Sequence, residues 1–230
     1  MKKILVTLVL AAAAISSSYA QGWVLFNNTT TTRVSTNAIA GGAATGLTFA
    51  AGAGTSYYYA LFSSTSTQNI GGATNANAGA VGTYAFNDGS WYFNNPSFGP
   101  DYGTNTLTAG RFNTTEADPA NSQGTQVTSG ASQSFVVIGW SSNIGSTVAQ
   151  LITWYNTAGH LGIDGWIGQS STSAFMSPGT GGVNPVPGLF GTGSGLIPGF
   201  TLGLVIAPEP STIALAGLGG LSLLLFRRRK

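Results

Sequence analysis

Charged side chains are almost absent from the interior of this 230-residue chain. Between residues 21 and 206, two basic residues, Arg33 and Arg111, stand against five acidic residues, a net charge of −3. The overall charge of +2 arises because the other basic residues gather at the two ends. Nucleic-acid binding needs clustered Lys and Arg to neutralise phosphates. The interior of the chain lacks such clusters, so we expect no nucleic-acid partner.

The composition favours a single β-rich domain. Charged residues make up 6% of the chain, against about 25% in ordinary soluble domains, and Thr, Ser and Asn fill most polar positions. These residues, with many aromatics, favour strands and turns over helices. An aromatic content of 11% is too apolar for a solvated chain, although low complexity is an alternative for residues 28–56 and 177–198. The chain has no Cys, so packing or assembly must stabilise it.

Short apolar and aromatic runs predict the strands. The run at 134–141 (SFVVIGWS) is apolar between its two serines, which predicts a buried central strand. Asn87-Asp88-Gly89 predicts a tight hairpin turn, because such turns need positive φ. The hairpin strands would be 80–86 and 90–93, and further strands are predicted at 23–27, 56–62, 106–113, 126–129 and 200–206.

One segment, 146–157, breaks this β pattern and predicts a short helix. Apolar residues recur at helical spacing from Val148 to Tyr155. Thr147 and Gln150 have the spacing of a capping box, in which each side chain satisfies a backbone N–H of the first turn. The β-branched residues of the segment leave a strand as the alternative.

The remaining pattern predicts how the domain is organised. The Pro- and Gly-rich stretch 177–198 predicts a long loop that returns the chain to the sheet. Closely spaced strands, frequent Gly turns and one helix predict a mainly β fold, a single antiparallel β-sandwich of jelly-roll type over residues 21–206. Hydrophobic targeting helices are expected at both ends of the chain.

The first twenty residues have the three parts of a secretory signal peptide. Lys2 and Lys3 form the positive region, and an apolar stretch follows at 4–15. A membrane anchor is the alternative, but this stretch is shorter than the roughly 20 residues that cross a bilayer. The small residues that follow place signal-peptidase cleavage between Ala20 and Gln21.

The chain holds no specific catalytic motif. His160 is the only histidine, and without Cys it cannot belong to a His- or Cys-rich zinc site. Asp164 lies four residues further on, but no serine sits in a G-x-S-x-G elbow, so nothing specific supports a Ser-His-Asp triad. No glycine-rich turn has the Lys of a phosphate loop. We therefore expect no enzyme activity and no cofactor.

The scattered acidic residues leave two further interpretations open. The first is a glycosidase, which would need two of these five acids, such as Glu116 or Asp118, to lie roughly 5–10 Å apart across a cleft. A loop calcium site could use Asp101, Glu116 or Asp118 together with carbonyl oxygens. No EF-hand-like loop accompanies these residues, so no metal site is predicted.

Aromatic side chains are the remaining candidates for ligand binding. Rings exposed on a sheet can stack on sugars, and Trp91, Tyr92 and Trp166 are the candidates for such a carbohydrate platform. A domain poor in Leu and Met also needs rings to fill its core. We expect most rings to serve the core.

The C-terminal tail has three parts. Pro208, Glu209 and Pro210 precede an apolar stretch at 213–226. As a helix this stretch would be about 21 Å long, short for a hydrocarbon core of about 30 Å. The chain then ends in four basic residues, Arg227, Arg228, Arg229 and Lys230. Positive charge there would hold the C-terminus in the cytoplasm and leave the body outside.

This layout resembles the PEP-CTERM sorting tail of exported bacterial proteins, with Ala207 where members often have Val. The resemblance implies that Pro208, Glu209 and Pro210 are recognised by an exosortase, a transpeptidase-like membrane enzyme. Residues 213–226 would insert transiently in the inner membrane, and 227–230 would stop transfer. The family also implies a Gram-negative bacterium that makes exopolysaccharide, and it implies no particular activity for the body.

Signal peptide, body and tail together predict an exported, exosortase-sorted protein of the cell envelope or extracellular matrix. We expect a structural or adhesive role, with exopolysaccharide or further copies of the chain as partners. A carbohydrate-binding module that uses surface aromatics is the alternative, and a hydrolase is the third hypothesis.

Overall fold

The computed structural model describes residues 21–37, 45–52, 54–65, 84–94, 102–114, 122–128, 130–179 and 186–207. The predicted targeting segments at both ends lie outside these residues, as do Asp101, Glu116 and Asp118. The helices are η2 (Ala85–Asn87), α2 (Val148–Asn156) and η3 (Ala158–Gly162). The strands are β1 (Gln21–Leu25), β2 (Val34–Asn37), β3 (Gly46–Leu47), β4 (Tyr57–Ser64), β5 (Tyr92–Phe93), β6 (Gly103–Asn105), β7 (Phe112–Thr114), β8 (Ser122–Thr128), β9 (Ser134–Ser141), β10 (Gly165–Gln169) and β11 (Phe200–Val205).

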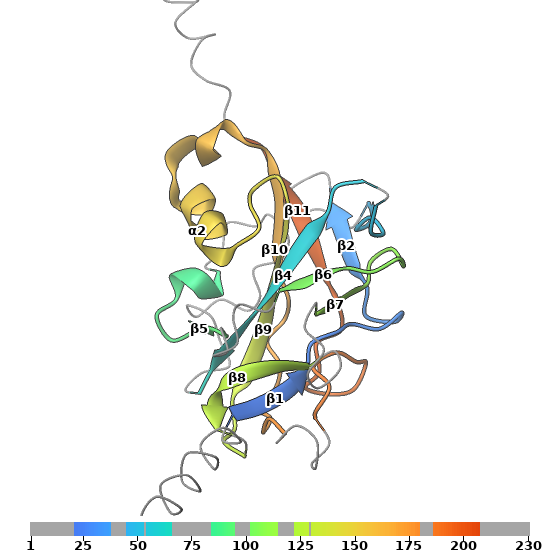
Figure 1. The fold of residues 1–230 in the computed structure, drawn as a ribbon, viewed down its shortest axis with the longest axis vertical. Helices are drawn as coiled ribbons and strands as arrows, with labels where there is room; N and C mark the ends of the chain where they lie inside the picture. Colours follow the sequence, from blue (N-terminus) through green and yellow to red (C-terminus); the bar gives the residue numbers. More distant parts are fainter. Residues whose placement is uncertain are drawn as a thin grey trace, which may run out of the picture.

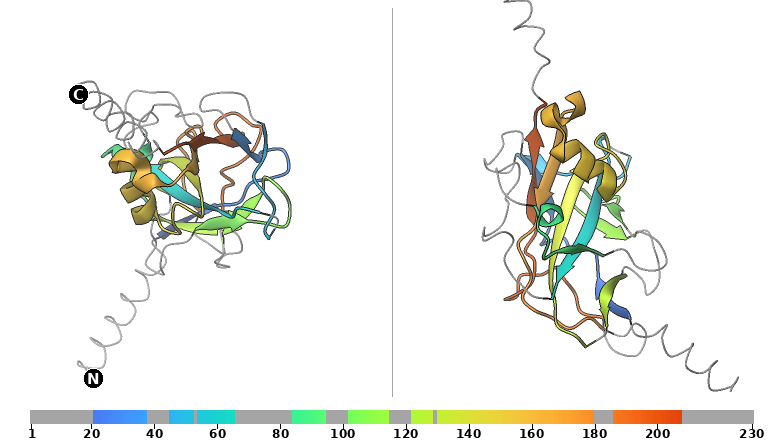
Figure 2. Two further views of the ribbon diagram at one scale, coloured as in Figure 1. Left: turned by 90° about the horizontal axis from the view of Figure 1, so that it is seen from above. Right: turned by 90° about the vertical axis from the view of Figure 1, so that its left-hand side faces the viewer.

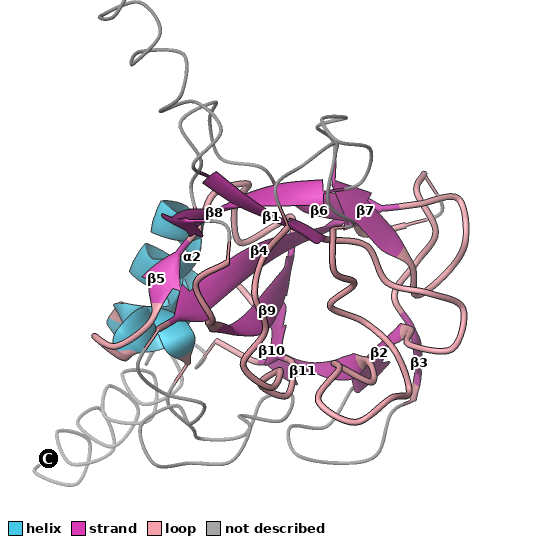
Figure 3. Cartoon of the chain, turned by 90° about the horizontal axis from the view of Figure 1, so that it is seen from below, coloured by secondary structure: helices cyan, strands magenta, loops and turns pink. Residues whose placement is uncertain are grey.

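Most of the strands belong to one curled sheet. Its order is β3-β2-β11-β10-β9-β4-β6-β7, with β5 paired to the end of β4, while β1 and β8 form a separate two-stranded sheet. The sheet curls into a half-barrel, with β6 and β7 on one side of the opening and β2 and β3 on the other (Figures 1 and 3). The predicted mainly β fold with one helix is confirmed. The predicted antiparallel sandwich is not, since the large sheet is curled and its β11–β2 pair is parallel.

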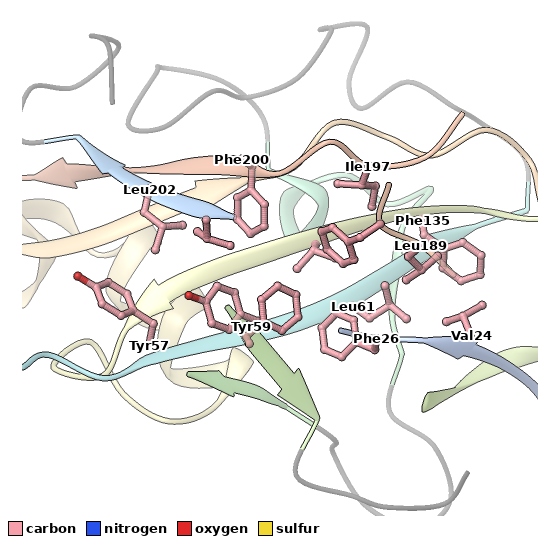
Figure 4. Packing of buried hydrophobic residues seen from close by; sticks show 14 residues of the cluster. Val24, Phe26, Tyr57, Tyr59, Leu61, Phe135, Leu189, Ile197, Phe200 and Leu202 are labelled. Atoms are coloured by element: carbon pink, nitrogen blue, oxygen red, sulfur yellow. The ribbon is translucent and has the colours of Figure 1, made fainter. Parts of the chain in front are cut away.

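Both faces of the central strands β4 and β9 are buried. All eight residues of β9 are buried, as the apolar run predicted, and successive side chains point to opposite faces. One set of side chains fills the concave side of the sheet, and we call it the inner core (Figure 4). It comprises Val24, Phe26, Val34, Tyr57, Tyr59, Leu61, Phe112, Phe135, Val137, Leu189, Phe190, Ile197, Phe200 and Leu202.

The alternate side chains of β4 and β9 form an outer core on the convex side. There α2 and η2 cover the sheet (Figure 2). The outer core comprises Ala60, Phe62, Tyr84, Ala85, Trp91, Val136, Ile138, Trp140, Ile144, Val148, Leu151, Trp154 and Ile167. The half-barrel therefore needs two apolar layers, which explains how so many rings are buried in a chain of this size.

Glycines on the concave side make room for the tight curl. A Cβ at Gly139 would lie 2.9 Å from the ring of Tyr59, and one at Gly103 would lie 2.6 Å from the ring of Phe112. These two rings stack on each other with centroids 4.2 Å apart. At Gly168 a Cβ would collide with the carbonyl oxygen of Thr201 on the neighbouring strand. Larger residues at these positions would push the strands apart.

The tip of the β6–β7 hairpin closes one end of the half-barrel. The Val34 N–H donates to the Gly110 carbonyl at 2.8 Å, and the Gly110 N–H donates to the Thr48 carbonyl at 2.9 Å. Gly110 has a φ of +76°, which favours glycine. The buried amide of Asn28 also donates to the Gly110 carbonyl, at 2.8 Å. Backbone hydrogen bonds thus join the two sides of the curl at this point.

Helix α2 confirms the predicted capping box. The Thr147 hydroxyl accepts from the Gln150 N–H at 3.2 Å, and the Gln150 side chain accepts from the Thr147 N–H at 3.1 Å. The hydroxyl of Tyr102 accepts from the Val148 N–H at 3.0 Å and satisfies a further group of the first turn. The helix lies on the outer core and buries Val148 and Trp154.

Two strand predictions are wrong. The hairpin around Asp88 is not formed in the described residues, because residues 85–87 form η2 and the Asp88 carboxylate accepts from the N–H and hydroxyl of Ser90. Of its two predicted strands, 90–93 is present in part as β5, which pairs with β4, and residues 80–83 lie outside the described residues. The run at 106–113 is mostly a turn, which joins β6 to β7. Strands β2, β3, β6 and β10 were not predicted. The segment at 177–198 forms no regular strand where it is described, yet it buries Leu189 and Ile197 in the inner core.

Tyr84 provides a test of the outer core. Its hydroxyl is buried and has no hydrogen-bond partner among the described residues, and burial raises the pKa of Tyr84 well above its usual range. Tyr84 is therefore neutral in the folded state, whereas its hydroxyl ionises near pH 10 in the unfolded chain. The contribution of Tyr84 to the free energy of unfolding therefore falls as the pH rises above 10. Urea unfolding should show Tyr84→Phe to be equally stable or more stable by about 1 kcal/mol at pH 7. The advantage should grow at pH 11, and a less stable variant at both pH values would contradict this packing.

Candidate functional site

The body of the protein ends at a defined contact beside the C-terminal tail. Strands β10 and β11 are antiparallel, with Gly165 opposite Val205. Asp164 immediately precedes β10, so this register places it beside the residues that follow β11. Its carboxylate accepts a hydrogen bond of 2.7 Å from the N–H of Ala207. Ala207 is itself buried, which fixes the residue directly before Pro208.

A left-handed turn supports this contact from the side of α2. Residues 159–162 all have positive φ, including His160 at +48° and Leu161 at +55°. Such a conformation costs a non-glycine residue roughly 1–2 kcal/mol. The indole N–H of Trp154 donates to the Ile163 carbonyl at 2.8 Å, and the Trp154 ring packs on His160 with centroids 4.8 Å apart. The buried tryptophan thus holds the turn against the helix.

His160 and Asp164 do not form part of a catalytic triad in this arrangement. The Nδ1 atom of His160 lies 3.4 Å from the Trp154 carbonyl oxygen, and the Asp164 carboxylate is engaged with Ala207. No hydrogen bond links the two side chains in the part of the chain that the structure describes. Among those residues there is also no group of three or more His, Cys, Asp or Glu that could hold a metal ion.

The structure does not bring the three candidate platform rings together. Trp91 is 5% exposed and belongs to the outer core, whereas Trp166 is partly buried and packs against the inner core. Tyr92 is 55% exposed and lies on β5. The two tryptophans therefore face opposite sides of the sheet, and Tyr92 alone of the three is largely open to solvent.

The predicted processing residues stand at the two ends of the body. Gln21 is the first residue of β1, whereas Ala20 lies outside the described residues. The same holds for the tail residues Pro208, Glu209, Pro210, Arg227, Arg228, Arg229 and Lys230. In Figures 1 and 2, β1 and the C-terminal end of β11 lie at opposite ends of the molecule.

Comparison with protein families decides what the tail is. Residues 207–230 match the PEP-CTERM protein-sorting motif. The tail is a PEP-CTERM motif. This motif implies an exported protein that an exosortase sorts to the cell envelope, as the sequence predicted. No curated protein and no solved structure matches the chain. Within the residues that the structure describes, no helix is long and apolar enough to cross a membrane.

The PEP-CTERM motif therefore begins at the residue that Asp164 holds. The sequence pattern did not reveal this role, because Asp164 and Ala207 are 43 residues apart and meet only through the β10–β11 register. The strand β10 was itself missed, so no pairing could be assigned to Asp164.

Replacing Asp164 tests this contact. In Asp164→Ala, the amide proton of Ala207 should exchange with solvent at least several-fold faster, because its acceptor is lost. Global stability should change by less than about 1 kcal/mol, since Asp164 is exposed. Asp164→Asn retains an acceptor oxygen and should keep most of the protection. Equal exchange rates at Ala207 in all three proteins, measured by hydrogen–deuterium exchange, would contradict the contact.

Proposed function

We propose that the mature protein is a non-enzymatic structural or adhesive component of the cell envelope or extracellular matrix of a Gram-negative bacterium. Signal peptidase would cleave between Ala20 and Gln21, and the apolar stretch 213–226 would insert transiently in the inner membrane. An exosortase would then process the tail. Exopolysaccharide and further copies of the chain are the proposed partners of the body.

The observation that carries this proposal is how the body uses its reactive and aromatic side chains. The described carboxylates of Asp88 and Asp164 accept backbone hydrogen bonds, and His160 packs on Trp154. Most rings that could have formed a ligand platform fill the two cores instead. What the described surface offers is mainly uncharged Thr, Ser, Asn and Gly, which suits hydrogen bonding to hydrated polysaccharide.

A carbohydrate-binding module is the alternative, and the exposed ring of Tyr92 favours it. Stacking of a sugar on one ring would make binding depend strongly on that residue. A surface of distributed polar contacts would depend little on any one side chain. The two hypotheses thus predict different responses to the same substitution.

Co-sedimentation of the purified mature protein with the host's exopolysaccharide separates them. For the proposed role, the protein should co-sediment or self-associate, and Tyr92→Ala should change binding by less than about twofold, as for a minor interface contact. Asn143→Ala, a substitution of another exposed residue, is the matched control. A loss of tenfold or more in Tyr92→Ala alone, about 1.4 kcal/mol, would favour the module. A protein that neither binds nor self-associates would contradict the proposal.

A further inference from the structure

The body and the apolar part of the tail are separated by a very short tether. The body is fixed up to Ala207 by its burial and by the hydrogen bond to Asp164. Only residues 208–212 lie between Ala207 and the apolar stretch at 213–226, and two of them are prolines. The following inference rests on the proposed insertion of that stretch in the membrane.

The tether sets how far the body can stand from the bilayer. Six Cα–Cα steps of about 3.3–3.6 Å span about 20 Å when fully extended. The headgroup region on each side of the hydrocarbon core takes up roughly 5–8 Å of this distance. While the tail is inserted, the end of the body that carries Ala207 must therefore lie close to the membrane surface.

That end of the body presents two exposed apolar side chains. Ile206 is 65% exposed beside Ala207, and Leu161 is 54% exposed on the left-handed turn. The turn and the C-terminal end of β11 lie at the same end of the molecule (Figures 1 and 2). The turn keeps Leu161 outside the outer core despite its apolar side chain, with a φ of +55° that leucine rarely adopts.

The electrostatics of this end favour an apolar contact over a charged one. Residues 157–164 and 200–207 contain no Lys or Arg. Their ionisable side chains are His160, which packs on Trp154, and Asp164, whose carboxylate accepts from Ala207. Attraction to anionic headgroups needs basic residues. A contact made here would depend on burying Leu161 and Ile206.

We propose that Leu161 and Ile206 contact the bilayer interface while the tail is inserted. The lipid surface would hold this end of the body flat against the membrane and keep Pro208, Glu209 and Pro210 at the headgroup level, where a membrane-embedded enzyme can reach them. While the tail is inserted, the tether is too short to let the body leave the membrane. The contact therefore ends only when the tail is removed.

The absence of Cys allows this contact to be measured with single-cysteine variants. The tail-bearing form, produced in a host without exosortase, is reconstituted in vesicles of phosphatidylethanolamine and phosphatidylglycerol. A fluorescent label is placed on Leu161→Cys or Ile206→Cys, and quenching by spin-labelled lipid headgroups is recorded. A label on Ser222→Cys, with acyl-chain quenchers, reports whether the tail is inserted.

Phe175→Cys provides the matched control, since Phe175 is also exposed, at 43%. Its neighbour Met176 pairs with Gln133 just before β9, whereas Asn143, just after β9, donates to the Asp164 carbonyl. The eight residues of β9, about 25 Å long, separate the two ends.

We expect headgroup quenching at 161 and 206 to exceed that at 175 several-fold. Equal quenching at all three positions, with Ser222→Cys inserted, would overturn the proposed contact and leave the sorting proposal standing. If the labels at 161 and 206 became shielded from solvent only after exosortase was added, the proposed lipid contact would also be overturned, in favour of a protein partner. A label at 222 that stays outside the acyl chains would contradict membrane insertion of the tail, and the contact with it.

Discussion

Replacing Asn28 by alanine is expected to lower the free energy of unfolding by about 4 kcal/mol, because three buried hydrogen bonds are lost together. The Asn28 amide donates to the carbonyls of Thr32 and Gly110 at 2.9 and 2.8 Å, and its oxygen accepts from the Phe112 N–H at 2.8 Å. Asn28 is completely buried, so water cannot replace these bonds. The loss falls where the β6–β7 hairpin closes the half-barrel. Urea unfolding followed by tryptophan fluorescence measures it.

Two variants show whether the effect belongs to this network. Asn28→Asp keeps the acceptor but loses both donors and buries a charge, so it should be at least as destabilising. Asn143→Ala removes an exposed hydrogen bond to the Asp164 carbonyl and should cost less than about 0.5 kcal/mol. If Asn28→Ala were no more harmful than Asn143→Ala, closure of the half-barrel would not depend on this amide.

Gly168→Ala is expected to cost about 3 kcal/mol although it adds only a methyl group. Gly168 lies in β10, opposite Gly139 of β9. Its Cβ would collide with the Thr201 carbonyl oxygen and would lie 2.9 Å from the Leu202 Cα. Backbone atoms cannot turn away as a side chain can, so the β10–β11 pair must shift. For a domain of this size the melting temperature should fall by roughly 6–12 °C.

Gly89→Ala is the matched control for this substitution. Gly89 is exposed, and a Cβ there would meet nothing within 4 Å. We expect its melting temperature to stay within about 2 °C of the parent protein. A Gly168→Ala protein as stable as Gly89→Ala would show that glycine is not needed for the curl at β10.

Elements with a strong local signal could be predicted from the sequence. The apolar run of β9 and the aromatic run of β4 became the two central strands, and the capping box began α2 where it was expected. In each case the residues that decide the structure are neighbours in the chain. Local propensity and burial then agree, which is the condition under which such patterns are informative.

Elements that depend on distant partners could not be predicted. Strand β2 has the sequence VSTN, with one strongly apolar residue, and its place is set by parallel pairing with β11. Strand β10 contains two glycines, which argue against a strand unless a neighbouring backbone comes as close as β11 does. At Asp88 the side chain bonds to Ser90, and this local bond replaces the turn that the Asp-Gly pair indicated.

The candidate site shows the same division. The three parts of the tail are contiguous in sequence, so the PEP-CTERM motif could be recognised without a structure. The contact that fixes Ala207 joins residues from two strands and could only be seen once β10 was paired with β11. The curl that turns most rings inward likewise depends on the whole sheet.

Intact-mass measurement of the protein from the envelope fraction tests the central claim most directly. Native cells and cells that lack the exosortase are compared. In native cells we predict the mass of a chain that begins at Gln21 and lacks both the apolar stretch 213–226 and the basic residues 227–230. Cells without the enzyme should hold the tail-bearing form in the inner membrane. A surface protein that keeps the whole tail, or the same mass in both strains, would contradict exosortase sorting.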